Sequence, residues 1–403
     1  MLALPLKFTL LLSLFVTAGN VNAGDETYRH ASENIGSVRA VYDGNLYPDI
    51  QVNTFRNIDR LFPSRLVKRG NTVLELPLSK TPLKQFSYDV DGKQYDLYDV
   101  LSMNRVSGMI MLHRGEIVFE KYLLGNDEHT RWMSMSIAKS VTATLIGAAI
   151  QDGAIKSIND PIVNYLPRFK DTAYDGVTVQ QLLQMRSGVA WNETYTDPTS
   201  DRRRMLEAQI SQKSGAILDL MASLPRAAAP GSVWNYSTGE TQVAGALVQA
   251  ATGKTVADYL SEKIWAPLGM QSDASWWLES PDGLEIGGSG LAATLRDYGR
   301  LGLFLSHDGK IDQQRVLPQG WIKAASRAQV IAGKQIDYGY MLWPLHGNSY
   351  AAEGIFGQYV FVDPDKQLVV VMLSAQAKPL NRAPLDEHAF LRALSAYFPD
   401  NSK

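Results

Sequence analysis

The sequence predicts an α/β protein of the α+β kind, in which helices flank one antiparallel sheet and a mostly helical domain is inserted. Strand-like runs occur near residue 110 and again beyond residue 335, and the segment between them has helical periodicity. With 45% hydrophobic and 20% charged residues, the 403-residue chain can bury a large core. We therefore expect one sheet built from both ends of the chain, with a site in the cleft beside the inserted domain.

Residues 1–23 have the pattern of a secretory signal peptide. A short head with Lys7 precedes an apolar stretch, and small residues end at Ala23, so we predict cleavage after Ala23. The alternative is a membrane anchor, but the apolar stretch is short for a bilayer span of about 20 residues. No later segment is apolar enough to span a membrane. We predict a periplasmic or secreted protein with no stable membrane span after removal of the signal.

The composition argues against several partners and cofactors. The formal net charge is −2, which gives no basic surplus for a nucleic-acid partner. The chain contains no cysteine, which excludes a cysteine nucleophile and a thiolate metal site. Its six histidines have no metal-ligand spacing. We therefore expect no metal and no other cofactor, and the oligomeric state stays open.

The rest of the chain is predicted to divide into three parts. Residues 24–95 lack a long periodic run and are expected to form an extension packed on the main domain. Residues 96–153 and 285–403 are expected to form the α/β domain, and residues 154–284 the helical domain.

The elements follow in order along the chain. Residues 106–125 predict a hairpin, because two β-rich runs flank a turn at residues 113–116. A buried helix follows from near Ser134, since apolar residues occupy all its faces. Helical periodicity then marks residues 177–188, 238–253, 256–270 and 294–309, with Thr178 and Thr294 as predicted N-caps. Strands are predicted at 336–345, 351–364 and 366–375, and an amphipathic helix at 384–398.

Ser136 and Lys139 lie three positions apart near the start of the buried helix. Residues at this spacing share one helix face, so the lysine amine can reach the serine hydroxyl. A serine becomes a nucleophile when a base takes its proton, and a lysine can be that base if burial lowers its pKa. The N–H groups at the helix N-terminus can stabilise developing negative charge. The alternative is a lysine that extends from a core helix to solvent.

Two other segments can complete such a site. Tyr236 leads into the predicted helix 238–253, where its phenol can pass a proton beside a lysine; the alternative is a half-buried tyrosine with one hydrogen bond. Gly354 and Gly357 interrupt a strand pattern, which indicates close approach of a backbone or ligand. A strand edge there can complete an oxyanion hole, and the alternative is a β-bulge.

The Ser-x-x-Lys at 136–139, the segment Tyr236-Ser237-Thr238 and the glycine-containing strand, in this order, resemble the serine β-lactamase and penicillin-binding protein superfamily on its class C side. The resemblance covers about residues 100–400. Within the superfamily the segments SMSIAKS, NYSTGETQVAG, YTDPTSD and GIFGQ most resemble the 6-aminohexanoate-dimer (nylon-oligomer) hydrolases and related carboxylesterases. The resemblance implies a β-lactamase/transpeptidase-like fold and a serine hydrolase that cleaves small amides or carboxylic esters.

The resemblance also implies a role for each catalytic residue. Ser136 would be the acylated nucleophile, Lys139 its activating base and Tyr236 the proton shuttle. The backbone N–H groups of Ser136 and Ile355 would form the oxyanion hole.

Three further residues are implied to bind substrate. Tyr195 would contact the substrate amide, Trp343 would form a pocket wall, and Gly354 would lie beside the substrate.

Two departures from the superfamily pattern bear on the substrate. Thr238 stands where the Tyr-x-Asn motif has asparagine, and Ala352-Glu353-Gly354 replaces Lys-Thr-Gly. Glu353 would repel the carboxylate of a penicillin if it faces the cleft. The alternatives are a DD-peptidase or β-lactamase acting on cell-wall peptides or β-lactams, and a non-catalytic peptidoglycan-binding module.

Overall fold

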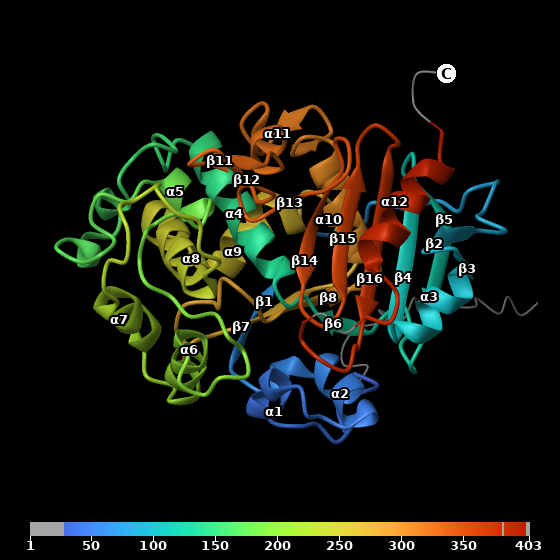
Figure 1. Cartoon of the computed structure of the whole chain (residues 1–403), viewed down its shortest axis with the longest axis horizontal. Helices are drawn as coiled ribbons and strands as arrows, with labels where there is room; N and C mark the ends of the chain where they lie inside the picture. Colours follow the sequence, from blue (N-terminus) through green and yellow to red (C-terminus); the bar gives the residue numbers. More distant parts are fainter. Residues whose placement is uncertain (1–27, 381–382, 400–403) are drawn as a thin grey trace, which may run out of the picture.

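The computed structural model, which describes residues 28–380 and 383–399, is a mixed α/β fold in which helices flank antiparallel sheets (Figure 1). The predicted signal peptide, residues 1–23, lies outside the described residues. Within the described part of the chain, no helix is long and apolar enough to cross a bilayer.

The helices are α1 Val38–Asp43, α2 Pro48–Phe55, α3 Leu97–Met103, α4 Ile137–Gln151, α5 Val179–Leu183, α6 Asp201–Ile210, α7 Ala216–Ser223, α8 Thr238–Thr252, α9 Val256–Leu260, α10 Leu295–Ser306, α11 Trp321–Ala325 and α12 Glu387–Tyr397. The strands are β1 Ser64–Val67, β2 Ser87–Val90, β3 Lys93–Asp96, β4 Val106–His113, β5 Glu116–Tyr122, β6 Arg131–Met133, β7 Ala274–Trp277, β8 Leu291–Thr294, β9 Lys310–Ile311, β10 Gln314–Arg315, β11 Gln329–Ile331, β12 Lys334–Ile336, β13 Trp343–Pro344, β14 Tyr350–Gly354, β15 Gln358–Asp363 and β16 Leu368–Ser374.

The main sheet has six antiparallel strands in the order β13-β14-β15-β16-β4-β5, so it joins segments from both halves of the chain. Its centre is the pair β16 and β4, where Val371 lies opposite Ile110. Alternate residues of β16 serve two cores: Val369 and Val371 pack in the larger core that includes α10, and Val370 and Met372 pack with α12. Because both faces are covered, β16 is apolar throughout rather than alternating.

A second antiparallel sheet contains the strand that precedes the candidate site in the sequence. Its order is β1-β7-β8-β6, so the segment that precedes the main sheet contributes β1, which pairs with β7. Strand β6 pairs with β8 through Trp132 opposite Ala293, and it ends three residues before Ser136. Helix α4 then passes between α8 and β14, and all its residues from Ile137 to Ala149 are buried.

Several predicted elements differ in extent. The segment 351–364 forms two strands instead of one, because Phe356 (φ 66°) and Gly357 (φ 84°) adopt the left-handed conformation and reverse the chain between β14 and β15. The predicted strand 336–345 is reduced to β13, since the N–H of Gly339 bonds back to the carbonyl of Leu342. The helix predicted at 177–188 is only the five residues of α5, and residues 261–265 after α9 form a π-helical turn.

Candidate active site

Ser136 is presented by a strained turn between β6 and α4. The preceding residue, Met135, has φ 48°, in the left-handed region that is costly for a side-chain-bearing residue. The N–H of Ser134 donates to the carbonyl of Leu291 at 2.7 Å, which fixes the turn to β8. Ser136 is the N-cap residue of α4 and is half-buried, so its hydroxyl lies at the helix N-terminus and within reach of the pocket.

Lys139 lies directly behind this serine. Its Nζ donates to Ser136 Oγ at 2.8 Å and to the carbonyl of Gly288 at 3.0 Å. The side chain is buried, and burial lowers the pKa of Lys139 to about 7. The carboxylate of Glu193 raises this pKa and the Arg202 guanidinium lowers it. An amine with a pKa near neutrality is partly deprotonated at pH 7 and can accept a proton.

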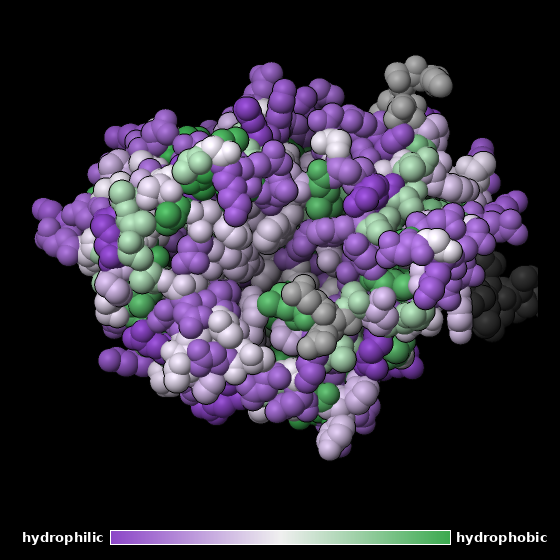
Figure 2. Space-filling model, in the orientation of Figure 1, coloured by the Kyte–Doolittle hydropathy of each residue, from purple (hydrophilic) through white to green (hydrophobic). Residues whose placement is uncertain are grey.

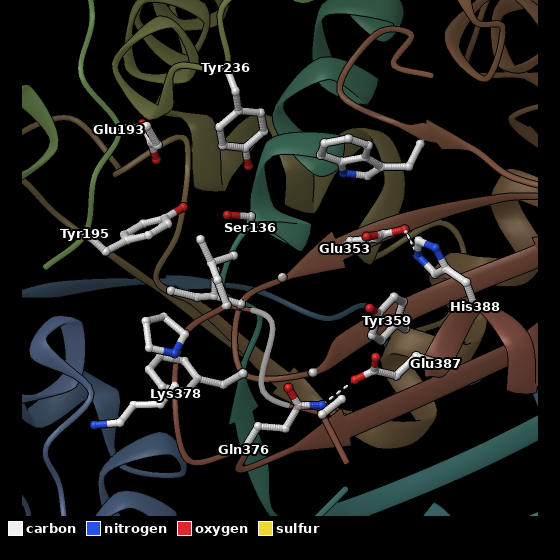
Figure 3. Close-up of a pocket in the computed structure, with 18 of the residues that line it drawn as sticks. Ser136, Glu193, Tyr195, Tyr236, Glu353, Tyr359, Gln376, Lys378, Glu387 and His388 are labelled. Atoms are coloured by element: carbon white, nitrogen blue, oxygen red, sulfur yellow. Dashed lines mark hydrogen bonds and ion pairs between the residues drawn. The ribbon is translucent and has the colours of Figure 1, made fainter. Parts of the chain in front are cut away.

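Tyr236 approaches Ser136 from the N-terminus of α8 (Figure 3). Its ring centroid lies 5.3 Å from Lys139 Nζ, and its hydroxyl is within hydrogen-bonding reach of Ser136. Burial, followed by the charge of Glu193, raises the pKa of Tyr236, so the phenol keeps its proton at neutral pH. The ring of Trp343 stacks on Tyr236 at 5.9 Å and lines the pocket as an aromatic wall.

The end of β14 packs against the start of α4. A Cβ atom added at Gly354 would lie 2.7 Å from the carbonyl oxygen of Ser134 and 3.0 Å from the nitrogen of Ser136. Glycine is therefore required by close approach of two backbones, as the sequence predicts. Ile355, the next residue, lines the pocket together with Ser136.

Two charged residues that the sequence analysis missed, the half-buried Glu193 and the buried Arg202, lie near the serine and lysine. Glu193 accepts the N–H of Thr238 at 2.9 Å and also the Thr238 hydroxyl, so it holds the first turn of α8. The guanidinium of Arg202 lies 4.2 Å above the ring of Tyr42 and 6.0 Å from that of Tyr195. Arg202 also lines the small recess of about 10 Å³ beneath Ser136.

The signals for these charges were weak in the sequence. Glu193 stands two residues before Tyr195 in a polar loop, where an acidic residue is ordinary. Its partner Thr238 is 45 positions away, and no local pattern links the two.

A further carboxyl group is buried in the first turn of α8. The N–H of Glu240 donates to the hydroxyl of Ser237, and the Glu240 carboxyl accepts the hydroxyl of Ser187. Burial raises the pKa of Glu240 to about 8, so this group is largely uncharged at neutral pH.

The pocket in front of Ser136 has a volume of about 880 Å³. The surface is hollowed near the middle of the face in Figure 2, where the helical side meets the main sheet. Six of the seven predicted site residues line it: Ser136, Tyr195, Tyr236, Trp343, Gly354 and Ile355. Lys139, the seventh, lines the recess beneath the serine.

The residue that replaces the threonine of Lys-Thr-Gly also faces this pocket. Glu353 lines the pocket, and its Oε1 is 2.9 Å from His388 Nε2 of α12. Within the described residues no group of three or more His, Asp or Glu side chains has the geometry of a metal site.

Comparison with known proteins identifies the family. A profile of the beta-lactamase family matches residues 102–394. A 6-aminohexanoate-dimer hydrolase of Paenarthrobacter ureafaciens is 28% identical over 309 residues, which cover 71% of this chain and 77% of that protein. Esterase EstB of Burkholderia gladioli is 30% identical over 152 residues, covering 36% of this chain and 38% of the esterase.

A solved structure shares the fold over most of its length. It comes from Bacillus anthracis and is provisionally named a 6-aminohexanoate-dimer hydrolase; it covers 85% of this chain and 92% of its own, with a TM-score of 0.76 and 24% identity. The relatives are hydrolases and esterases, and the profile match extends over more than half of the chain. The chain therefore belongs to the beta-lactamase family, as an enzyme of the serine-hydrolase type.

Proposed function

We propose that the enzyme hydrolyses small amides or carboxylic esters through an acyl-enzyme on Ser136. One observation carries the proposal: the Lys139 amine, buried and with its pKa lowered to about 7, lies 2.8 Å from the Ser136 hydroxyl. The relatives named as a 6-aminohexanoate-dimer hydrolase and as an esterase support the same chemistry.

In acylation, each of these groups either transfers a proton, forms a bond or stabilises charge. Neutral Lys139 takes the hydroxyl proton of Ser136, whose Oγ bonds to the substrate carbonyl carbon. The carbonyl oxygen receives the displaced electron pair and is stabilised by the N–H groups of Ser136 and Ile355. As the bond to the leaving group breaks, the Tyr236 hydroxyl protonates that group and is reprotonated by the Lys139 ammonium.

Deacylation uses the same groups, and the protons move between them in the opposite direction. Water gives a proton to Lys139 through Tyr236 while its oxygen bonds to the acyl carbon. The ester bond to Ser136 breaks, Oγ takes a proton from the Lys139 ammonium, and a carboxylic acid leaves. The opposite pKa shifts of Lys139 and Tyr236 support this division, because the amine can be the base while the phenol stays protonated.

Three pocket residues are proposed to hold the substrate. Tyr195 is buried, and its hydroxyl end points toward Ser136 in Figure 3, where it can contact the substrate amide. Trp343 supplies an apolar wall beside Tyr236, and Gly354 lines the pocket where it would lie beside the substrate.

Covalent labelling tests the proposal directly. A fluorophosphonate should label Ser136 in the wild-type protein, as located by peptide mass spectrometry, and the protein should hydrolyse p-nitrophenyl esters. Ser136→Ala should lose both while keeping the wild-type circular dichroism spectrum. A folded wild-type protein that is neither labelled nor active would refute the acyl-enzyme.

Two alternatives have less support. A DD-peptidase or β-lactamase is favoured by a 27% identity over 113 residues to an Escherichia coli protein named as a D-alanyl-D-alanine carboxypeptidase. Glu353 opposes it, because a carboxylate in the pocket repels the carboxylate of such substrates. A non-catalytic binding module would not need Ser136, Lys139 and Tyr236 to converge, and Ser136→Ala would leave its binding intact.

We also propose export, with cleavage after Ala23, since residues 1–23 have the signal-peptide pattern. Amino-terminal sequencing of the protein from a periplasmic fraction tests this. A mature protein that begins at Met1 in the cytoplasm would contradict it.

A further inference from the structure

Helix α1, which precedes the main sheet in the sequence, brings a side chain to the active site. Ser37 caps the helix by accepting a backbone N–H, and Gly44 ends it in the left-handed conformation (φ 61°). Tyr42, in the last turn, is 2% exposed and lines the recess beneath Ser136. A segment that lies before residues 102–394, the part matched by the family profile, therefore supplies part of the wall around the nucleophile.

The ring of Tyr42 contacts two residues of the site. It stacks on the ring of Tyr195, with centroids 6.2 Å apart and planes inclined by 7°. The Arg202 guanidinium lies 4.2 Å from the centroid of the Tyr42 ring, which makes a cation–π contact. Arg202 is buried, and its Nε has no hydrogen-bond partner among the described residues. Tyr42 therefore helps to hold a buried charge that hydrogen bonds satisfy only in part.

Polar contacts fix α1 on α6 and on the loop that carries Tyr195 (Figure 1). Arg203 of α6 donates from Nη1 to the carboxylate of Asp43, and from the same atom to the carbonyl of Tyr195 at 3.1 Å. Arg39 donates two hydrogen bonds to Glu207, at 2.8 and 2.6 Å. One arginine thus joins α1, α6 and the backbone of Tyr195, so the last turn of α1 has a fixed place beside the site.

We propose that Tyr42 is a positioning residue of the active site, which holds the ring of Tyr195 and the guanidinium of Arg202 in place. This inference rests on the proposed hydrolysis at Ser136. The role is indirect, because Tyr42 acts through its two neighbours. Through Tyr195 it orders the contact with the substrate amide. Through Arg202 it keeps in place the charge that opposes protonation of Lys139.

The pH dependence of kcat/KM tests the role that acts through Arg202. For a neutral ester, kcat/KM should rise with pH as Lys139 loses its proton. The charged or titratable groups around this amine are Glu193 of the loop before α6, Arg202 of α6 and Tyr236 before α8. Tyr42→Leu removes the aromatic face that holds the guanidinium, so the charge of Arg202 should lower the pKa of Lys139 less. The rise in kcat/KM should therefore occur at higher pH, as in Arg202→Gln.

A double variant separates this positioning role from a general loss of stability. If Tyr42 acts on the pH dependence through the guanidinium, Tyr42→Leu should cause no further shift when it is added to Arg202→Gln. Tyr42→Phe keeps the ring and should keep the wild-type pH dependence. Shifts that add in the double variant would show that Tyr42 does not act through Arg202.

Hydrolysis of a p-nitroanilide tests the role that acts through Tyr195. Tyr42→Leu removes the ring on which Tyr195 stacks, so kcat/KM should fall by about 10- to 100-fold. The comparison is made at high pH, where Lys139 is neutral and the first effect is absent. In a Tyr195→Leu background the same change should cost less than about twofold, because the residue that it positions has been removed.

Phe62→Leu provides a matched control. Phe62 is another buried ring ahead of the main sheet, but it packs edge-on to Trp277 at 5.1 Å and lines neither the pocket nor the recess. Phe62→Leu should lower the urea midpoint of unfolding, as Tyr42→Leu does, while its pH dependence and anilide kinetics stay as in the wild type.

Unchanged pH dependence and anilide kinetics in folded Tyr42→Leu would overturn the positioning role, as would equal changes in Phe62→Leu or Tyr42→Phe. Tyr42→Met, which keeps apolar volume without a flat ring, takes the place of Tyr42→Leu if that variant does not fold. A wild-type protein whose Ser136 is not labelled by a fluorophosphonate would instead overturn the proposed hydrolysis.

Discussion

Lys139 is almost fully buried, and burial removes the water that would stabilise its ammonium form. Two charges then act on it in opposite directions. Glu193 favours the protonated amine and Arg202 disfavours it. The two charges partly offset each other, so burial decides the outcome and the amine is partly neutral at pH 7.

A pH–rate profile should report this amine. We expect kcat/KM for a neutral ester to rise with pH through about 7 and then level off, because the protonated amine present below this pKa cannot accept the serine proton. Lys139→Met should lower kcat/KM by about 100- to 10,000-fold. If the residual activity of this variant kept the same limb, another group would be the base.

The two neighbouring charges should move that limb in opposite directions. Glu193→Gln removes the charge that raises the pKa of Lys139, so its limb should shift to lower pH, while the amide oxygen can still accept the Thr238 N–H. Arg202→Gln removes the charge that lowers this pKa, so its limb should shift to higher pH. Stopped-flow ester hydrolysis at several pH values measures both. Shifts of the same sign would contradict this electrostatic account.

At the scale of elements, the contact between β14 and α4 positions the site. Gly354→Ala should lower kcat/KM by about 100-fold, because its Cβ would meet backbone atoms of Ser134 and Ser136 that cannot move aside. Overpacking of this kind also costs about 1–3 kcal/mol of the free energy of unfolding.

A matched glycine in α8 provides the control. The nearest atom to a Cβ at Gly245 is 3.7 Å away, so Gly245→Ala has room and should raise helix stability by up to about 1 kcal/mol. Kinetics and urea unfolding of both variants measure the contrast. Equal losses of activity would show that the contact of β14 with α4 is not the cause.

The sequence predicted those elements whose conformation depends on residues close to them in the chain. Thr178 and Thr294 accept the predicted N-cap hydrogen bonds, from Gln181 and Asp297. The hairpin at 355–357 was not predicted as a turn, because Phe356 holds a left-handed conformation that its residue type disfavours. That conformation is maintained by surrounding packing and cannot be read from adjacent residues.

The same distinction applies to the candidate site. Ser136 and Lys139 share one helical turn, so their approach follows from spacing alone. Tyr236 was a candidate from its own segment, and the resemblance to a family was needed to add Tyr195 and Ile355. Neither route indicated that Glu193 and Arg202 would flank the lysine, because loop geometry brings them there.

At the scale of the whole molecule, Glu240 should make stability depend on pH. Its pKa is raised to about 8 in the folded protein, so the folded state keeps a proton that the unfolded state loses above about 4.5. The free energy of unfolding should therefore fall as pH rises from about 4.5 to 8, by a few kcal/mol in order of magnitude. Glu240→Gln should flatten this fall, as measured by urea unfolding at a series of pH values. Parallel curves for the two proteins would exclude a contribution from Glu240.

The division of the chain into an extension, an α/β domain and an inserted helical domain stays a prediction. The main sheet nevertheless depends on distant segments, since β4 pairs with β16 across more than 250 positions. Such non-local pairing is formed slowly, because closing a long loop costs entropy before contacts are gained.

The placement of β14 late in the chain also sets when activity can arise during synthesis. When α11 has been synthesised, Ser136 and Lys139 are already part of the nascent chain. Strand β14, which packs against the start of α4, has not yet been made. Nascent or prematurely terminated chains that lack β14 should therefore have no hydrolase activity.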